Sequence, residues 1–389
     1  MSSLRAVVAH GGGPTAVLNA SLAGLVDECR SSGGFASLEG ARFGVQGLLS
    51  GEYVDLLAQP PDLIESIAQA PGSAIGSSRR KLEGAEYERV IGELRRRDVH
   101  WLFHTGGNGS MSTALQLERF ARAAGYELGV TGIPKTIDND LRVTDHTPGY
   151  APTARFFACA ARDVGEDNRS LPSPICVLET LGRNAGWIVA ATSLARRHDD
   201  DAPHLIYFPE RGLSLDRIAA DSERVVSRLG RVTIAVCEGQ LDEAGQPFGA
   251  DVDRPAIAQQ RLASNLGHTL AQLLAAKTGL RARSERPGLL GRSCGPFANA
   301  RDRATSYECG LAAARAALEG RSGCMVAIRR ESSDPWITST FLTPLEAVAG
   351  KERALPLEWI APDANDVMPA FHEYARPLIG DVPGYSRLL

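Results

Sequence analysis

The sequence is poor in lysine and has no paired-cysteine motif. Its 42 basic residues include four lysines, so a lysine inside a motif stands out. The seven cysteines form no Cys-x-x-Cys pair, which argues against a zinc site or a disulfide framework and favours reduced thiols that pack as small apolar side chains. The lysines are Lys81, Lys135, Lys277 and Lys351.

Charge and hydropathy exclude further classes of partner. The net charge of -4 shows no basic excess of the kind that nucleic acid or an anionic membrane requires. Glycine at Gly11 interrupts the first apolar run too early for a signal peptide or a membrane span. We therefore expect a cytoplasmic protein that binds neither nucleic acid nor membranes. With 389 residues, 43% of them hydrophobic, the chain suits a globular protein of two or three domains.

Short apolar runs alternate with longer helical patterns, which predicts βαβ units and a mostly parallel sheet. The pattern starts again after a boundary near Pro148-Gly149, and the chain is expected to cross back later. The expected strands are Leu4–His10, Val99–Thr105, Leu128–Ile133, Ile175–Glu179, Val232–Cys237 and Met325–Arg329. The expected helices are Val17–Cys29, Ser112–Ala124, Ala185–Arg197, Ser214–Arg228 and Ala256–Lys277.

A glycine loop follows the first expected strand. Gly11-Gly12-Gly13 lets the backbone approach an anion, and the helix N-terminus that comes next favours negative charge. The loop also fits the dinucleotide fingerprint G-x-G-x-x-A, whose ribose-binding acid would be Glu39 or a neighbour. That stretch does not resemble the end of a strand, which counts against an oxidoreductase. A plain tight turn is the third interpretation, and the chain contains no Walker-type G-x-x-x-x-G-K-[ST].

Two other expected strands end in polar clusters. Gly106 to Ser110 offers backbone donors and the amide of Asn108, and Pro134 to Asp140 holds a cation, a hydroxyl and two carboxylates. Loops at the carboxyl edge of a parallel sheet converge, so we expect one site there. Phosphoryl transfer to an alcohol needs these residue types: Asp138 to take the proton, Lys135 and an arginine to neutralise charge, and Asp140 or Asn108 to hold Mg²⁺.

These motifs together resemble the phosphofructokinase family, in family order and over nearly the whole chain. The C-terminal stretch 371–389 is similar to that of long bacterial pyrophosphate-dependent members. The segments that carry the resemblance are Gly11 to Ser21, Gly76 to Arg79, Gly106 to Ser110, Pro134 to Asp140, Thr147 to Tyr150, Glu179 to Trp187, Cys237 to Gly239 and the pattern from Asp302.

The resemblance implies two Rossmann-like, three-layer α/β/α domains with mostly parallel sheets and the active site in the cleft between them. Residues 1–147 plus about 293–345 would bind the phosphate donor, and 148–292 plus about 346–389 would bind the sugar phosphate. The implied reaction is Mg²⁺-dependent transfer of a phosphoryl group to the 1-hydroxyl of fructose 6-phosphate. A homodimer or homotetramer with shared sites is also implied.

The resemblance also assigns roles to single residues. Asp138 is the implied base, Lys135 and Arg183 act with it in catalysis, and Asn108 and Asp140 are the implied metal ligands. The implied donor-binding residues are Gly12, Gly13, Arg79, Gly107, Asn108, Gly109 and Ser110. The implied sugar-phosphate residues are Thr136, Asp138, Leu181, Gly182, Arg183, Glu238, Arg286 and Arg292, where Arg286 reaches the substrate of a neighbouring subunit.

The choice of donor depends on two positions. In the family, lysine at the position of Lys135 is typical of pyrophosphate users. Gly109 stands where many of those enzymes have an aspartate that obstructs ATP. Together with the first loop and the C-terminal match, the sequence favours pyrophosphate, with ATP as the alternative.

Three departures from the family pattern bear on activity. Asn108 replaces an aspartate, so we expect weaker Mg²⁺ binding, because an amide oxygen brings no charge. Arg292 either replaces an aromatic residue or supplies the family's phosphate-binding arginine after a short deletion. Pro174 stands where a basic residue often binds the substrate phosphate. A non-catalytic member of the fold, or one that uses another ketose phosphate such as sedoheptulose 7-phosphate, is the remaining alternative.

Overall fold

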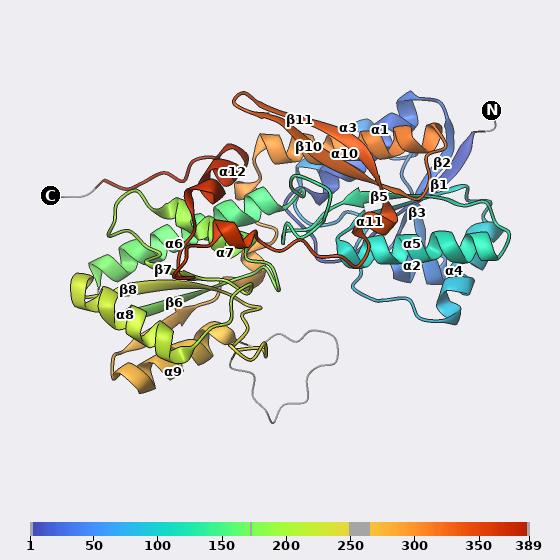
Figure 1. Ribbon diagram of the computed structural model, residues 1–389. Helices are drawn as coiled ribbons and strands as arrows, with labels where there is room; N and C mark the ends of the chain where they lie inside the picture. The colour runs from blue at the N-terminus through green and yellow to red at the C-terminus, as the bar shows by residue number, and fades with distance from the viewer. Residues whose placement is uncertain (1–2, 172, 249–264, 387–389) are drawn as a thin grey trace. The chain divides into compact units, whose positions relative to one another are not determined.

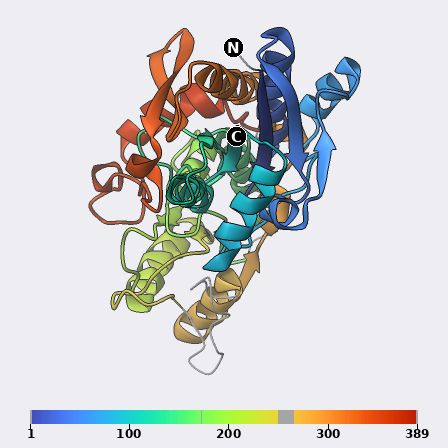
Figure 2. The same cartoon turned by 90° about the vertical axis from the view of Figure 1, so that its right-hand side faces the viewer.

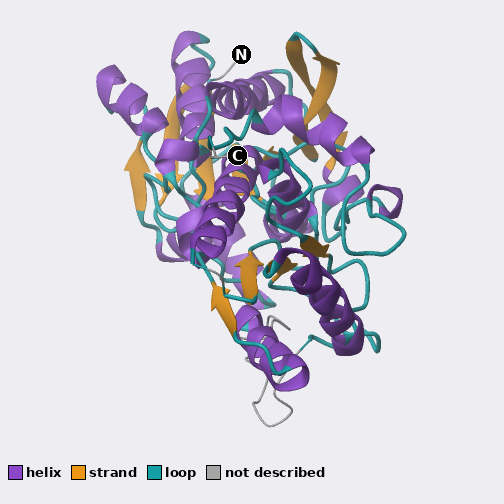
Figure 3. Cartoon of the chain, turned by 90° about the vertical axis from the view of Figure 1, so that its left-hand side faces the viewer, coloured by secondary structure: helices purple, strands orange, loops and turns teal. Residues whose placement is uncertain are grey.

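The computed structural model describes residues 3–171, 173–248 and 265–386, and the chain divides into two compact units. Unit 1 consists of Met1–Tyr150 and Arg292–Arg353, and unit 2 consists of Ala151–Gly291 and Ala354–Leu389. Each unit is built from strands and helices in alternation (Figure 3). The predicted α/β fold class is therefore confirmed. In the described ranges, every helix is too short or too polar to cross a lipid bilayer.

Unit 1 contains a seven-stranded sheet in the order β11-β10-β5-β4-β1-β2-β3. The neighbours from β10 to β2 run parallel, and the edge strands β3 and β11 are antiparallel. Strands β10 and β11 form a long hairpin, drawn in orange and visible in two views (Figure 1 and Figure 2). The strands are β1 (Leu4–His10), β2 (Phe35–Ala41), β3 (Tyr53–Asp55), β4 (Trp101–Gly106), β5 (Gly129–Pro134), β10 (Cys324–Ser333) and β11 (Trp336–Pro344).

Two hydrophobic cores cover the two faces of this sheet. Val7 and Ala9 of β1 face one core, and the alternate residues Ala6 and Val8 face the other. A strand that is apolar on both faces is typical of the middle of a parallel sheet. Helices α2 (Val45–Ser50), α4 (Ala85–Arg96), α5 (Asn108–Ala123) and α11 (Leu345–Val348) contribute to the first core. Helices α1 (Leu18–Ser31), α3 (Pro61–Gln69) and α10 (Ala300–Leu318) contribute to the second.

Unit 2 contains a smaller sheet in the order β7-β8-β6-β9, in which all neighbours are parallel. Val177 and Ile234 pack with helices α8 (Leu215–Leu229) and α9 (Leu266–Thr278) on one face, and Leu178 packs with Ala161 of α6 (Tyr150–Ser170) on the other. The strands are β6 (Ile175–Thr180), β7 (Leu205–Tyr207), β8 (Val232–Cys237) and β9 (Ala282–Glu285). The helices are α6 (Tyr150–Ser170), α7 (Trp187–Ala191), α8 (Leu215–Leu229), α9 (Leu266–Thr278) and α12 (Pro369–Ile379). Unit 2 also has short 3₁₀ turns at Thr192–Ala195, Gly288–Gly291 and Leu357–Trp359. Unit 1 has one such turn at Gly295–Phe297.

Several predicted elements differ from the observed ones. Helix α5 begins at Asn108, four residues before its predicted start at Ser112. The helix predicted over Ala185–Arg197 is two short pieces, α7 and the 3₁₀ turn Thr192–Ala195. The helix predicted over Ala256–Lys277 begins at Leu266 within the described residues, and 256–264 lie outside them.

One prediction about the first half of the chain was wrong. Glu39 lies inside strand β2, which is parallel to β1 and adjacent to it, whereas the sequence did not indicate a strand there. The segment Phe35–Ala41 contains no β-branched residue, which removes the usual strand signal. Glu39 lies 3.8 Å from Arg97 as an ion pair. Because Glu39 does lie in a strand, the argument that the sequence raised against dinucleotide binding does not hold.

Candidate active site

The loops that follow β1, β4 and β5 meet at the carboxyl edge of the unit 1 sheet. Gly11 N–H donates to Thr105 O at 2.8 Å, which joins the first loop to the end of β4. Lys135 N–H donates to Gly106 O at 3.0 Å, which joins the third loop to the second. Gly12 N–H donates to Ser78 O at 2.8 Å, so the Gly76 to Arg79 segment borders the same place. The three polar clusters thus form one site, as convergence at a parallel sheet edge predicts.

Lys135 is the cation of this site and is 3% exposed. Its Nζ donates to Gly11 O at 2.8 Å and to Gly13 O at 2.7 Å, so the glycine loop bends around the ammonium group. Gly12 has a φ of +82°, and a Cβ at this position would lie 3.1 Å from Nζ. A glycine is therefore needed both for the backbone conformation and for the close approach of the charge.

Two buried histidines lie at the ends of β1 and β4, near this lysine. Burial, followed by the charge of Lys135, lowers the pKa of His10 to about 3 and that of His104 to about 4. His10 Nδ1 lies 2.8 Å from Ser73 Oγ. Both imidazoles are therefore neutral at pH 7, and Lys135 supplies the positive charge under the loop.

The N-terminus of helix α5 forms the second loop. Gly107 precedes the helix, and Asn108, Gly109 and Ser110 form its first turn. Backbone N–H groups at a helix N-terminus favour an anion. Ser110 is buried, and its Oγ fills the space beside Gly11. A Cβ on Gly11 would lie only 2.2 Å from this oxygen. Gly109 is exposed, and a Cβ there would have no atom within 4 Å.

Asn108 and Asp140 pair directly. Asn108 Nδ2 donates to Asp140 Oδ2 at 2.8 Å, and it lies 3.3 Å from Asp140 O. Within the described residues, Asn108 Oδ1 and Asp140 Oδ1 are both shielded from solvent and accept no hydrogen bond. Two such oxygens on neighbouring side chains fit a hard divalent cation such as Mg²⁺.

The electrostatics of Asp140 agree with that use. Burial, followed by the charges of Asp138 and Glu352, raises the pKa of Asp140 to about 7. A cation beside this carboxylate would favour its charged form. In the described part of the chain, no three His, Cys, Asp or Glu side chains gather as a metal-binding group. A cation held here would rely on the Asn108–Asp140 pair and on oxygens of a bound ligand.

The loop from Thr136 to Asn139 carries the candidate base. Asp138 is 9% exposed, and its N–H donates to Thr136 Oγ1 at 3.1 Å. Asn139 is buried at a φ of +55°, and its Oδ1 accepts from Thr147 N–H at 3.0 Å. Thr147 Oγ1 donates in turn to Thr136 O at 2.8 Å. Asp138 therefore lies in a turn that side-chain bonds hold on both sides.

The two arginines assigned to unit 1 lie differently. Arg292 follows the glycine loop closely, because a Cβ on Gly13 would lie 3.0 Å from Arg292 Cδ and 3.1 Å from one of its guanidinium nitrogens. Arg79 is exposed. The guanidinium group next to the loop is therefore that of Arg292.

In unit 2, the segment Leu181-Gly182-Arg183 follows β6 and lies beside the end of β8. Gly182 and Arg183 have φ values of +134° and +52°. A Cβ at Gly239 would lie 1.6 Å from Arg183 O, so only glycine permits this approach. Cys237 Sγ lies 3.3 Å from Arg183 O as a weak donor. Cys237 and Gly239 of the C-E-G motif therefore pack directly against the loop that carries Arg183.

Acidic side chains surround this loop. Burial and the charge of Glu179 raise the pKa of Glu238, while Arg183 lowers it. Glu179 is buried, and its Oε1 pairs with Arg286 Nε at 2.8 Å while its Oε2 accepts from Gly267 N–H at 2.7 Å. Arg286, which the resemblance assigns to a neighbouring subunit's substrate, is thus bound to Glu179 within its own unit, with 48% of its side chain exposed.

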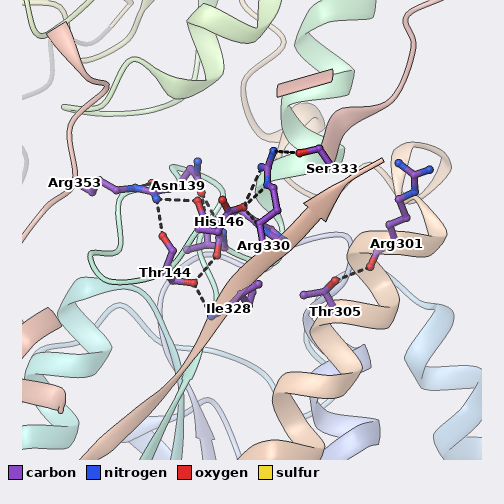
Figure 4. Close-up of polar contacts among 11 residues, drawn as sticks. Asn139, Thr144, His146, Arg301, Thr305, Ile328, Arg330, Ser333 and Arg353 are labelled. Carbon is purple, nitrogen blue, oxygen red and sulfur yellow. Dashed lines mark hydrogen bonds and ion pairs between the residues drawn. The ribbon is translucent and has the colours of Figure 1, made fainter. Parts of the chain in front are cut away.

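Sequence reasoning missed one residue at this site. Arg353 donates hydrogen bonds to the backbone carbonyls of Asn139 and Thr144 (Figure 4) and to that of Asp145. It lies more than 200 residues further along the chain than these partners. Contacts to backbone oxygens depend on no partner side chain, so no motif could have indicated them.

Comparison with known proteins identifies the family. The model of the family "Phosphofructokinase" matches residues 5–317, and the chain belongs to this family. It is 37% identical over 383 residues to "Pyrophosphate--fructose 6-phosphate 1-phosphotransferase" of Rhodospirillum rubrum, covering 97% of this chain and 94% of the relative. It is 34% identical over 400 residues to the protein of the same name from Xanthomonas campestris pv. campestris, covering 98% and 93%.

A solved structure agrees with these sequence matches. The pyrophosphate-dependent phosphofructokinase from Marinobacter aquaeolei superposes with a TM-score of 0.87 at 29% identity, covering 99% of this chain and 93% of that one. The predicted resemblance is confirmed. The glycine loop after β1 is accordingly the loop of this family, and the dinucleotide interpretation is dropped.

Proposed function

We propose that the chain transfers a phosphoryl group from pyrophosphate to the 1-hydroxyl of fructose 6-phosphate with the help of Mg²⁺. The observation that carries this proposal is the buried ammonium group of Lys135, which Gly11 O and Gly13 O hold at the start of the loop that also carries the base candidate Asp138. The two sequence relatives described above carry the name of this reaction. We infer that unit 1 binds the donor and that unit 2 binds the sugar phosphate.

Unit 1 stabilises the diphosphate donor through backbone N–H groups and through a buried positive charge. N–H groups of the glycine loop and of the α5 N-terminus at Gly107 to Ser110 bind its oxygens. Lys135 adds a full positive charge in a place that water does not reach, where electrostatic stabilisation is strongest. Arg292, which lies on Gly13, supplies the phosphate-binding arginine, and the exposed Arg79 reaches the outer end of the donor.

The chemical step is an in-line displacement. The sugar's O1 attacks the terminal phosphorus, the P–O bond to the bridging oxygen breaks, and orthophosphate leaves with the electron pair. Asp138 accepts the proton of the 1-hydroxyl as the new O–P bond forms, while Thr136 orients that hydroxyl. The products are fructose 1,6-bisphosphate and orthophosphate.

Unit 2 supplies recognition of the acceptor. Arg183 neutralises charge on the phosphorylated sugar, and Leu181 and Gly182 shape its binding loop. Glu238 accepts hydrogen bonds from sugar hydroxyls, a role that suits a carboxylate. Arg286, which is paired with Glu179 in the free protein, binds the 6-phosphate of a neighbouring subunit's substrate in a homodimer or homotetramer. We place the enzyme in the cytoplasm.

Asn108 and Asp140 are the residues that would hold Mg²⁺, each through its Oδ1 atom. When bound, the ion neutralises charge on the phosphates that it contacts. The amide in place of a second carboxylate makes the protein's own contribution weak, so the diphosphate would bring much of the affinity.

ATP is the second candidate donor, and one observation favours it. A Cβ at Gly109 would meet nothing within 4 Å, so the position where a side chain would obstruct a nucleotide is open.

Turnover with each donor decides between them. We expect fructose 1,6-bisphosphate to form with pyrophosphate and Mg²⁺, and at most slowly with ATP. Turnover with ATP alone would overturn the choice of donor. Sedoheptulose 7-phosphate tests the acceptor in the same assay. Absence of turnover with every donor and sugar, together with measurable binding of fructose 6-phosphate, would indicate a non-catalytic member of the family.

A further inference from the structure

Arg353 ends unit 1 and donates to three backbone carbonyls through its guanidinium group. Nε and Nη2 donate to Asn139 O at 3.1 and 2.8 Å. Nη1 donates to Thr144 O at 2.6 Å and to Asp145 O at 2.8 Å. Figure 4 shows this side chain pointing at Asn139 and Thr144.

These bonds fix the peptide groups on both sides of Asp140. Asn139 O belongs to the peptide that precedes Asp140 and accepts from the Arg353 side chain. Asp140 O belongs to the peptide that follows it and accepts from Arg353 N–H at 2.7 Å. Asn139 has a positive φ of +55°, which a non-glycine residue keeps only where the surrounding contacts impose it. One residue thus holds the backbone from which the Asp140 carboxylate projects toward Asn108.

The other partners of Arg353 are anchored to the sheet. Thr144 Oγ1 accepts from Ile328 N–H of β10 at 2.9 Å, and Asp145 N–H donates to Ile328 O at 2.9 Å. Asp145 also forms an ion pair with Arg330 at 3.0 Å. Arg353 therefore connects the loop of Asp140 to a segment that cannot move independently of β10.

We propose that Arg353 is a positioning residue that holds the Asp140 carboxylate against the Asn108 amide and thereby sets the affinity of the site for a divalent cation. This inference rests on the proposed function. Because Asn108 brings no charge, the Asn108–Asp140 pair contains one carboxylate, and the affinity of the pair for a cation depends on where that carboxylate lies. Residues that orient metal ligands typically contribute about 10- to 100-fold to metal affinity.

The experiment compares Arg353→Ala and Arg353→Lys with Arg30→Ala as the matched control. Arg30 is also a half-buried arginine of unit 1 that binds three backbone carbonyls, those of Leu56, Leu57 and Gln59, after β3. Binding of Mn²⁺ is followed from the loss of the free-ion signal in electron paramagnetic resonance. The Mg²⁺ concentration that gives half-maximal rate, the KM for fructose 6-phosphate and the melting temperature are measured in parallel.

We expect Arg353→Ala to weaken Mn²⁺ binding and to raise the half-maximal Mg²⁺ concentration about 10- to 100-fold, with little change in the KM for fructose 6-phosphate. Arg353→Lys should recover part of the loss, because an ammonium group can still donate to two of the carbonyls. Arg30→Ala should lower the melting temperature by a similar amount and leave Mn²⁺ binding unchanged.

Wild-type Mn²⁺ affinity in Arg353→Ala would overturn the inference, and so would an equal loss in Arg30→Ala. If Arg353→Ala does not fold, Arg353→Gln takes its place, and unchanged Mn²⁺ affinity there overturns the inference in the same way. An inactive wild-type protein would contradict the proposed function, whereas the Mn²⁺ titrations would still judge Arg353.

Discussion

The loops of the two units hold their charged side chains in different ways. In unit 1, Lys135 is gripped by the carbonyl oxygens of Gly11 and Gly13, and Asp140 is paired with an amide. In unit 2, Arg286 is paired with the buried carboxylate of Glu179. Carbonyl and amide dipoles hold a charged side chain in place without carrying a full opposite charge. In an ion pair, the partner's opposite charge cancels the charge of the side chain. Unit 1 is thus suited to stabilising charge that changes during a reaction, and unit 2 to exchanging one anion for another on binding.

The largest expected effect tests the reacting group of unit 1. Asp138→Asn should lower kcat about 10²- to 10⁴-fold, because a positioned base is removed while the shape of the turn is kept. Steady-state kinetics measure this, with the exposed Asp62→Asn as the control. Near-normal turnover in Asp138→Asn would show that Asp138 is not the catalytic base.

The second effect tests the buried cation. Lys135→Met should lower kcat/KM for pyrophosphate about 10²- to 10³-fold, as expected for the loss of one preorganised donor group. The pKa values of His10 and His104 should rise in this variant, because the charge of Lys135 lowers both. Histidine NMR titration measures that shift independently of catalysis. The exposed Lys81→Met is the control, and a loss of the same size there would contradict a local role for Lys135.

The third effect compares the stability of the units with pH. The pKa of His204 in unit 2 is lowered to about 4, chiefly by burial, and those of His10 and His104 in unit 1 are lowered as well. The unfolded chain binds these protons below pH 6.5 and the folded chain does not. Stability should therefore be full above pH 6.5 and fall as the pH drops toward 4, by about 2 kcal/mol per histidine at pH 5.

His204→Asn should remove its share of this loss in urea denaturation at pH 7 and pH 5. His204 Nδ1 accepts from Thr233 N–H at 2.8 Å, a bond that an Asn oxygen can keep and a protonated ring cannot. The exposed His268→Asn should leave the loss unchanged. Asp302, whose pKa burial raises to about 6, acts in the opposite direction, since its stability contribution falls as the pH rises from 3.8 to 6. Asp140, whose pKa is raised to about 7, acts in the same direction as Asp302, and both effects cancel when the variant is compared with the wild type. An equal change from pH 7 to pH 5 in the wild type and in His204→Asn would contradict a neutral His204.

The smallest effect tests recognition in unit 2. Glu238→Gln should raise the KM for fructose 6-phosphate about tenfold and change kcat less, because a hydrogen bond to a charged group contributes about 1.5–3 kcal/mol. Initial-rate measurements over a range of sugar concentrations show this, with the exposed Glu223→Gln as the control. A fall in kcat without a change in KM would place Glu238 among the reacting groups instead.

Regular, apolar elements could be predicted from the sequence, and elements that depend on tertiary contacts could not. Strands β1 and β8 lie exactly where the apolar runs place them, because each is buried along most of its length. Helix α5 starts earlier than predicted because Asn108, Gly109 and Ser110 are weak helix formers that the β4 and β5 loops hold in place. The helix after Ala185 breaks because Thr192 and Ser193 donate to carbonyls three residues back, at 2.5 and 2.7 Å.

The candidate site shows the same division. The glycine loop and the Pro134 to Asp140 cluster could be found because both directly follow apolar strands and together contain the residue types that phosphoryl transfer needs. The grip of Arg353 on Asn139 and the pairing of Glu179 with Arg286 could not, because they join segments that the sequence gives no reason to bring together. The unpaired oxygens of Asn108 and Asp140 likewise became visible only in the folded chain.

The order of strands in unit 1 has a consequence for synthesis on the ribosome. Strand β5 pairs with β10 through Thr131 and Cys324, so the unit 1 sheet lacks β10 until Ser333 and β11 until Pro344 has been made. All four strands of the unit 2 sheet are complete by Glu285. During translation the edge of β5 is therefore open while the second sheet is already whole, and a nascent-chain protease assay should find the strands of the unit 2 sheet protected before those of the unit 1 sheet.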